Sequence, residues 1–224
     1  MADSQNITDN LLEMYGRNDW IMRANFRRFI ARSGIDALPR DSRILDCGCA
    51  MGHFIGQLRE IGFTAVTGLD ASPEMARATE AHTGAPVLLM DAAALGEELD
   101  PASFDVVIAS DLMHHLRDTA DWRRFLDGVR HVLAPGGRLV IRDLWPAWPL
   151  TLLMAMARCP ALFVGPLKAR LQSFVDEKDL VANYLAHWPG SYREWLAGSG
   201  LEVEREADWL MHRITVARPK KSAP

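Results

Sequence analysis

Cysteine is scarce in this sequence, and its scarcity argues against a disulfide-stabilised fold. Only three cysteines occur in 224 residues, Cys47, Cys49 and Cys159. An odd, sparse count is typical of a reducing compartment, so we expect a cytoplasmic location. No metal site is expected, because a C-x-C pair does not complete a tetrahedral zinc site and no second pair lies at ligand spacing. We predict that Cys47 and Cys49 are small apolar core residues.

The sequence also lacks an excess of positive charge and a long uninterrupted apolar run. The net charge is −4 at pH 7. Proteins that hold nucleic acid by its phosphates usually carry a basic face, so nucleic acid is not an expected partner. The longest apolar stretch, residues 144–167, is interrupted by Pro146, Pro149, Arg158 and Pro160. A transmembrane span needs roughly 20 continuous apolar residues, so we expect none, with peripheral membrane contact left open.

What the sequence does contain is an alternation of apolar strands and amphipathic helices. The strands are continuously apolar, as in FDVVIAS at 104–110, which is typical of a parallel sheet covered on both faces. Ser72-Pro73-Glu74 has the residues of a helix start. We predict strands at 43–47, 65–70, 87–90, 104–110 and 138–142, and helices at 9–32, 52–60, from 72 onward and 121–132. The predicted fold class is α/β, a doubly wound and mostly parallel sheet.

The organisation of the chain changes after residue 143. Residues 144–190 are rich in Trp, Leu, Met and Pro and carry no strand signal, so we interpret them as an inserted helical lid. A helix at 192–197 and strands at 201–206 and 212–217 follow. We predict one domain over residues 1–224. Its parts are an N-terminal helical cap (1–40), a cofactor-binding core (41–143), the lid (144–190), a C-terminal helix with strands (191–218) and a tail (219–224).

One glycine-containing turn carries most of the functional information. The run ILDCGCAMGHF, residues 44–54, leads from a strand through Gly48 and Gly52 into a helix, the place where open parallel sheets bind ligands. The dinucleotide fingerprint G-x-G-x-x-G does not fit glycines at 48, 52 and 56. A carboxylate at Asp46, near the strand end, would repel a pyrophosphate but suit a ligand with ammonium and sulfonium groups. The turn therefore favours S-adenosylmethionine over NAD.

Five segments, in order, resemble the motifs of class I S-adenosylmethionine-dependent methyltransferases of the small-molecule type. ILDCGCAMGHF resembles the first motif, with Ala50 where a glycine is common. An alanine is compatible with this turn if its φ is negative. The other four segments are GLDASPEM (68–75), MDA (90–92), FDVV through HHL (104–116) and LAPGGRL (133–139). The resemblance implies a Rossmann-like fold with seven strands, and S-adenosyl-L-methionine as the cofactor.

The resemblance also implies which residues bind that cofactor. They are Asp46, Gly48, Cys49, Gly52, Asp70, Ala71, Met75, Asp91, Ala92 and Ser110. Asp46 and its neighbouring glycines are expected at the methionine end, Asp70 at both ribose hydroxyls and Asp91 at the adenine amino group. Met75 is expected to pack on the adenine face. Taken singly, Asp70 is equally well interpreted as a helix-cap acid and Asp91 as a loop acid.

Two residues are candidates for catalysis. Transfer to an oxygen usually needs a base, and His114 follows the fourth predicted strand at its carboxyl end. Asp143 follows the fifth, as a base or as a hydrogen-bond acceptor for the substrate. The alternatives are that His114 holds the turn and that Asp143 is a salt-bridged loop acid. The candidate substrate-binding residues are Tyr15, His115, Trp145 and Trp148.

The aromatic side chains of residues 144–190 favour a small, apolar or aromatic methyl acceptor. The same side chains would also suit packing of the lid on the domain. We favour O-methylation over transfer to carbon or nitrogen. Two alternatives stay open: a non-catalytic S-adenosylmethionine-binding subunit on the same fold, and a nicotinamide oxidoreductase, which the glycine spacing disfavours. Both a monomer and a homodimer are compatible with the sequence.

Overall fold

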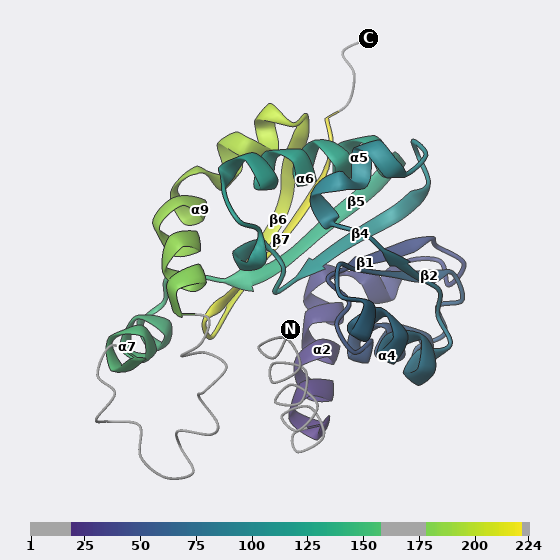
Figure 1. Cartoon of the computed structure of the whole chain (residues 1–224), viewed down its shortest axis with the longest axis horizontal. Helices are drawn as coiled ribbons and strands as arrows, with labels where there is room; N and C mark the ends of the chain where they lie inside the picture. The colour runs from purple at the N-terminus through teal and green to yellow at the C-terminus, as the bar shows by residue number, and fades with distance from the viewer. Residues whose placement is uncertain (1–18, 158–177, 221–224) are drawn as a thin grey trace.

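The computed structural model describes residues 19–157 and 178–220, and its centre is a seven-stranded sheet (Figure 1). The strands are β1 (Ile44–Cys47), β2 (Val66–Asp70), β3 (Val87–Leu89), β4 (Phe104–Ser110), β5 (Leu133–Leu144), β6 (Leu201–Trp209) and β7 (His212–Pro219). Their order is β3-β2-β1-β4-β5-β7-β6. Strands β1 to β5 pair in parallel, whereas β7 is antiparallel to both β5 and β6. The predicted seven-stranded, mostly parallel α/β sheet is confirmed.

Helices cover both faces of the sheet. They are α2 (Asp19–Ser33), α3 (His53–Glu60), α4 (Pro73–Thr83), α5 (Leu95–Glu98), α6 (Thr119–Val132), α7 (Trp148–Ala157) and α9 (Lys178–Gly198), with the 3₁₀ turns η1 (Ile35–Ala37), η2 (Ala92–Ala94) and η3 (Met113–His115). In Figure 1, α2 and α4 lie on one side of the sheet and α5 and α6 on the other. Side chains alternate along β4: Val107 packs with the α6 side and Ile108 with the α2 side.

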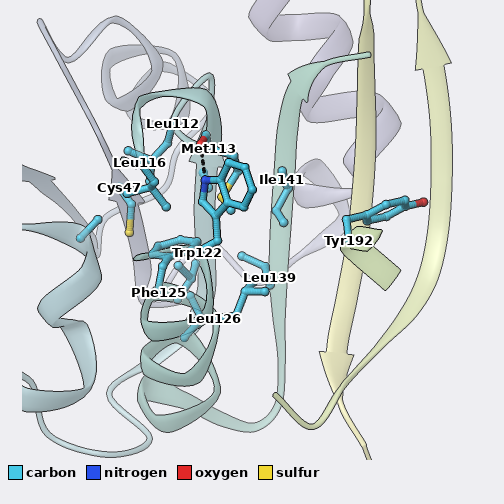
Figure 2. Packing of buried hydrophobic residues seen from close by; sticks show 14 of the residues in the cluster. Cys47, Leu112, Met113, Leu116, Trp122, Phe125, Leu126, Leu139, Ile141 and Tyr192 are labelled. Carbon is cyan, nitrogen blue, oxygen red and sulfur yellow. Dashed lines mark hydrogen bonds between the residues drawn. The ribbon is translucent and has the colours of Figure 1, made fainter. Parts of the chain in front are cut away.

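The α6 side of the core is built around one tryptophan (Figure 2). Trp122 is fully buried, together with Phe125 and Leu126 from the same helix and Leu139 from β5. Its Nε1 donates a hydrogen bond to the carbonyl oxygen of Met113 at 2.8 Å. This bond satisfies the polar group of a buried indole. It also fastens η3, the turn that follows β4, to the helix beneath it.

Several predicted boundaries agree with the structure and others move. Ser72 caps α4 as predicted, because its hydroxyl accepts a hydrogen bond from the Met75 amide at 3.3 Å, and Pro73 is the first helical residue. Helix α2 accounts for residues 19–32 of the helix predicted at 9–32, and residues 9–18 lie outside the described residues. Helix α6 begins at Thr119, two residues earlier than predicted, because Asp118 caps it.

The segment predicted as a lid and the helix predicted at 192–197 are joined. Helix α9 runs from Lys178 to Gly198, through residue 190, where a boundary was predicted, and Pro189 lies inside it. The boundary moves because one face of the whole helix is buried, at Val181, Tyr184, Trp188, Tyr192 and Leu196. The three- and four-residue spacing of these positions places them on one apolar stripe against the core. Within the described ranges, no helix is long and apolar enough to cross a membrane.

Candidate active site

The turn after β1 adopts a left-handed backbone at every second residue. Gly48, Ala50 and Gly52 have φ values of 72°, 47° and 74°. The amide of Gly48 donates to the carbonyl oxygen of Leu69 in the neighbouring strand at 2.7 Å. Ala50 therefore does not have the negative φ under which an alanine would fit this turn without strain. Alanine pays a steric cost in this conformation, since its Cβ approaches the following carbonyl oxygen.

Asp70, the last residue of β2, holds this turn in place. Its Oδ2 accepts a hydrogen bond from the Ala50 amide and its Oδ1 from the Ser72 amide, both at 2.9 Å. Thr79 on α4 adds a second connection by donating its hydroxyl to the Ala50 carbonyl oxygen at 2.6 Å. The cap of α4 is Ser72 and not Asp70. Because the Asp70 carboxylate favours an amide donor at Ala50, it compensates for the left-handed backbone there.

Carboxylates stand at the carboxyl end of all five parallel strands. Asp46 and Asp70 lie within the last two residues of β1 and β2, and Asp143 is the penultimate residue of β5. Asp91 and Asp111 follow β3 and β4 within two residues. Since parallel strands end on the same edge, these five aspartates form a row along it. We call them the strand-end aspartates.

The strand-end aspartates differ in how their charge is compensated. Asp46 is 2% exposed, and among the described residues no ion pair joins it to a cation. Burial, with a further contribution from the Asp70 charge, raises the pKa of Asp46 to about 8. A buried carboxyl with a raised pKa has a strong electrostatic preference for a cationic ligand. Asp111 and Asp143, in contrast, are held by neighbouring side chains and amides.

The remaining predicted cofactor residues surround this end of the sheet. Asp91 is exposed, and its Oδ1 caps η2 by accepting from the Ala93 amide at 2.9 Å, which is the loop-acid alternative. Ala92 and Met75 are buried, whereas Ala71 is exposed. The Oδ2 of Asp91 lies 3.7 Å from Arg117 Nη2, on a side chain that is 52% exposed, and a role of Asp91 in ligand binding stays a prediction.

The two cysteines of the turn are buried and free, as predicted for small apolar residues. Cys49 Sγ lies 3.7 Å from the Thr79 hydroxyl. Burial, chiefly, raises the pKa of Cys49 to about 12. The thiol therefore stays protonated at neutral pH. The third cysteine, Cys159, lies outside the described residues.

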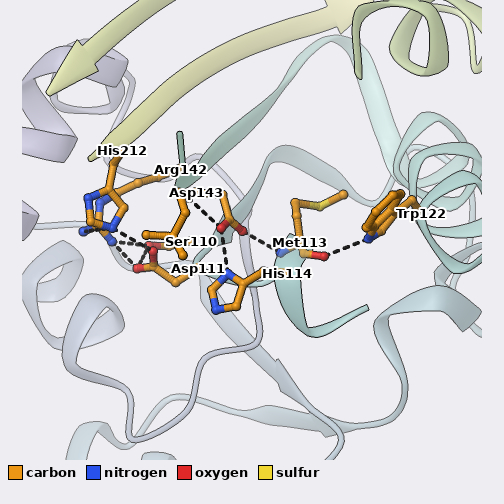
Figure 3. Close-up of polar contacts among 9 residues, drawn as sticks. Ser110, Asp111, Met113, His114, Trp122, Arg142, Asp143 and His212 are labelled. Atoms are coloured by element: carbon orange, nitrogen blue, oxygen red, sulfur yellow. Dashed lines mark hydrogen bonds and ion pairs between the residues drawn. The ribbon is translucent and has the colours of Figure 1, made fainter. Parts of the chain in front are cut away.

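The structure brings the two predicted catalytic residues together (Figure 3). His114 Nδ1 lies 2.7 Å from Asp143 Oδ1, and both side chains are buried. Asp143 also accepts from the amides of Met113 and Leu144, each at 2.7 Å. A carboxylate with two amide donors is an acceptor, so Nδ1 of His114 carries the proton in this pair. Asp143 is thus engaged in orienting His114 and η3, and is not a free base.

His115 and the aromatic residues of α9 surround the His114 ring. The ring centroids of His114 and His115 are 4.2 Å apart, and Tyr184 meets His114 edge-on at 6.2 Å. Desolvation and the neighbouring His114 lower the pKa of His115 to about 4, so its ring is neutral at pH 7. Tyr184 and Trp188 are buried against Trp122. These α9 aromatics are core residues, which was the alternative interpretation of the lid.

The predicted substrate-binding tryptophans differ in their surroundings. Trp145 follows β5 and packs against Tyr192, and the Arg213 guanidinium lies 3.6 Å from its ring centroid. Trp148 begins α7 and is 78% exposed. The contacts of Trp145 are those of a structural residue, while Trp148 has no ring partner among the described residues. Tyr15, the fourth candidate, lies outside the described residues.

Sequence reasoning missed a group of charged residues on the other side of β5 (Figure 3). Arg142 Nη1 contacts the Asp111 carboxylate and the Ser110 hydroxyl, and His212 Nε2 lies 3.3 Å from Asp111 Oδ1. The signal available in the sequence was the arginine that ends the apolar run 138–142. Its partner His212 joins only through the pairing of β7 with β5. Ser110, predicted to contact the cofactor, is part of this group.

Comparison with known proteins gives these features a context. A family model described as a methyltransferase domain matches residues 45–141. An uncharacterized methyltransferase of Mycobacterium tuberculosis is 32% identical over 99 residues, 44% of this chain and 48% of the relative. An O-methyltransferase of Penicillium expansum is 33% identical over 146 residues, 62% of this chain and 52% of the relative. The chain thus spans about half the length of the curated relatives it matches.

Solved structures agree with the fold over nearly the whole chain. The magnesium protoporphyrin IX methyltransferase of Synechocystis, crystallised with S-adenosylhomocysteine, superposes with a TM-score of 0.68 at 18% identity. The superposition covers 95% of this chain and 94% of that one. At this identity the likeness concerns the fold alone. Over residues 45–141 the chain thus carries a methyltransferase domain, on a Rossmann-like fold.

Proposed function

We propose that this protein is an S-adenosylmethionine-dependent methyltransferase that acts on an oxygen of a small, apolar or aromatic molecule. The observation that carries the proposal is the row of strand-end aspartates. Asp46 at β1 has no cationic partner among the described residues, whereas Asp111 at β4 and Asp143 at β5 are held by neighbouring groups. Asp46 at the end of β1 becomes a carboxylate beside a cation, so this site suits a cationic ligand and disfavours a pyrophosphate. The match of residues 45–141 to a methyltransferase domain and the relative named an O-methyltransferase support the same activity.

The described residues fit this cofactor. Asp46 provides a buried acid for its cationic groups. Gly48 and Gly52 supply the left-handed backbone of the turn, and Leu112 and Thr79 pack where their side chains would stand. Each Asp70 oxygen accepts one amide and retains a second lone pair for a ribose hydroxyl. The residues proposed to hold the cofactor are Asp46, Gly48, Cys49, Gly52, Asp70, Ala71, Met75, Asp91, Ala92 and Ser110.

His114 is the proposed general base. The bound cofactor supplies an electrophilic methyl group on a positively charged sulfur. The residues of the chain must align the acceptor oxygen with that methyl group and receive its proton. Because Nδ1 of His114 donates to Asp143, the Nε2 atom is the one with a lone pair for the acceptor proton. Asp143 then stabilises the imidazolium that forms.

A non-catalytic cofactor-binding subunit is the second candidate function. The contacts of Asp143 with Met113 and Leu144 would serve it equally well, since they stabilise the loop whether or not a proton moves. The mechanism differs in one observable respect. A catalytic His114 makes turnover depend on Asp143, whereas a binding subunit has no turnover with any acceptor.

Calorimetric titration with S-adenosylmethionine, S-adenosylhomocysteine and NAD tests the proposal. We expect micromolar binding of the two sulfur ligands, no binding of NAD, and loss of at least tenfold in affinity in Asp70→Asn. Asp105→Asn is the matched control, because Asp105 is the second residue of β4 and pairs with Arg43 at the opposite end of the strand. Failure of both sulfur ligands to bind the folded wild-type protein would refute the proposed cofactor.

A second experiment addresses the reaction itself. Wild-type protein is incubated with S-adenosylmethionine carrying a labelled methyl group and a panel of apolar phenols and quinols. Transfer of label to an oxygen, lost in His114→Asn, supports the proposed enzyme. Tight cofactor binding without transfer to any member of the panel would favour the binding subunit.

A further inference from the structure

Asp111, Arg142 and His212 form a charged group at the ends of β4 and β5 that the proposed cofactor site does not use. We propose that Asp111, held by Arg142 and His212, binds a hydrogen-bond donor of the methyl acceptor, a hydroxyl or N–H group other than the one methylated. The inference rests on the proposed function and deepens it, because it assigns the acceptor to molecules with a second polar hydrogen. No residue of this group was a candidate for acceptor binding on sequence grounds.

The backbone places Asp111 directly at the ligand edge of the sheet. Asp111 follows the last residue of β4, and its amide donates to the Arg142 carbonyl oxygen at 2.7 Å. Its φ is 56°, a left-handed conformation that is uncommon outside glycine. Such strain persists only where surrounding contacts impose it, and it is concentrated at functional sites. Here Arg142 contacts Asp111 through both its backbone carbonyl oxygen and its side chain.

Charge compensation at Asp111 comes from the buried side. The Arg142 side chain is 9% exposed, whereas that of Asp111 is 39% exposed. A buried guanidinium therefore holds the carboxylate on one side, while part of the carboxylate side chain is exposed to solvent. Although burial raises the pKa of Asp111, Arg142 and His212 together hold it well below its ordinary value. An acid in this state does not take up a proton at neutral pH, but it accepts hydrogen bonds well.

The Asp111 carboxylate has one lone pair without a hydrogen-bond donor among the described residues. A carboxylate can accept about four hydrogen bonds. Oδ2 is contacted by Arg142 Nη1 and, at 3.4 Å, by the Ser110 hydroxyl. Oδ1 lies 3.3 Å from His212 Nε2, which is also 3.5 Å from Arg142 Nη2. Among the described residues, the second lone pair of Oδ1 has no donor, on a side chain that is more than one-third exposed.

Asp111 is also electrostatically connected to the proposed base. His114 lies three residues further along the same loop, and the charges of the two groups interact. Asp111 likewise acts on His115 and Tyr184. His114 as the base and Asp111 as a fixed hydrogen-bond acceptor would hold a substrate with two polar hydrogens at two points. Two-point attachment fixes the orientation that in-line transfer requires.

The inference is tested by comparing diols with their mono-ethers. The probes are catechol, hydroquinone, and the monomethyl ether of each, which retains one hydroxyl to be methylated and lacks the second. For at least one of the two diols, we expect the wild-type kcat/KM per available hydroxyl to be roughly 10- to 100-fold higher than for its own monomethyl ether. In Asp111→Asn the diol should fall to the level of the ether, so that the ratio of the two kcat/KM values drops to about one. A loss common to both probes reports the charge of Asp111 on His114.

The controls separate this inference from the proposed function. Asp111→Asn preserves the shape of the side chain, so the buried Arg142 keeps a neighbouring oxygen, and a thermal melt confirms folding. Affinity for S-adenosylmethionine should stay within about twofold of wild type in both Asp111→Asn and Asp105→Asn, and Asp105→Asn should retain the preference for the diol. Equal losses for diol and ether would mean that Asp111 is structural only. A wild-type protein that binds the cofactor but prefers no diol, or accepts none of the four probes, also overturns the inference.

Discussion

Asp143 orients His114 through a 2.7 Å contact between Oδ1 and Nδ1, although the two residues lie 29 positions apart in the chain. The same carboxylate accepts the amides of Met113 and Leu144. One side chain from β5 thus sets the tautomer of the histidine and the path of the loop that carries it. A carboxylate that bonds one ring nitrogen of a histidine and so orients the other is the arrangement of a base and its orienting acid in enzymes.

Replacing Asp143 by asparagine should separate orientation from folding. An amide has one acceptor atom, so its NH2 group must face a donor, either an amide or His114 Nδ1. We expect Asp143→Asn to lower methyl transfer to a phenolic acceptor by about 10²- to 10⁴-fold and stability by about 1–3 kcal/mol. Cofactor affinity should change less than about twofold. Turnover within about threefold of wild type would show that His114 needs no orienting acid.

The raised pKa of Asp46 predicts the pH dependence of stability in the free protein. The folded-state pKa is about 8, above the ordinary value of 3.8, so the folded state binds the extra proton between these two values. Stability therefore falls as pH rises through this window, by about 1.4 kcal/mol per pH unit. Asp46→Asn should remove most of this decline, as measured by denaturant unfolding at pH 5, 6 and 7. Parallel pH profiles for the two proteins would contradict the assignment.

Because of the raised pKa of Asp46, we expect the protein to release a proton when the cofactor binds. A cation beside Asp46 favours the ionised carboxylate, so affinity for S-adenosylmethionine should rise with pH, at most about tenfold per unit. The test is calorimetry between pH 5.5 and 7, below the range of about 7.7–8 in which an α-amino group loses its proton. Buffers of different ionisation enthalpy then report the proton directly. Asp46→Asn should bind weakly and without this pH dependence, and a flat wild-type profile would oppose the prediction.

Ala50 should be a site where glycine stabilises the protein. Glycine removes the cost of a left-handed alanine, roughly 1–2 kcal/mol, against an entropic loss of about 0.4–1 kcal/mol. We expect Ala50→Gly to gain about 0.5–1 kcal/mol, or about 1–4 °C in Tm. Ala76→Gly is the control, since Ala76 lies inside α4 and glycine there should cost about 1 kcal/mol. A loss of stability in Ala50→Gly would mean that Asp70 and Thr79 fully compensate the strain.

Local sequence patterns were sufficient for the sheet and its ligand edge. Continuous apolar runs and helix signals such as Ser72-Pro73 are read over a few residues, and they predicted the strands and the start of α4. The strand-end positions of Asp46 and Asp70 followed, because parallel strands present their carboxyl ends on one edge. The sequence did not determine that Ala50 is left-handed. That conformation depends on Asp70 and Thr79, which lie 20 and 29 residues away.

Tertiary structure alone decided how the polar side chains at that edge are paired. The sequence proposed His114 and Asp143 separately, and only the parallel alignment of β4 with β5 makes one orient the other. Arg142 meets Asp111 because β5 lies parallel beside β4, and His212 joins them because β7 returns antiparallel beside β5, a pairing that no local pattern encodes. Residue spacing along the chain determines which elements form. Contacts between side chains on different strands depend on register, which is settled only when the whole apolar core packs.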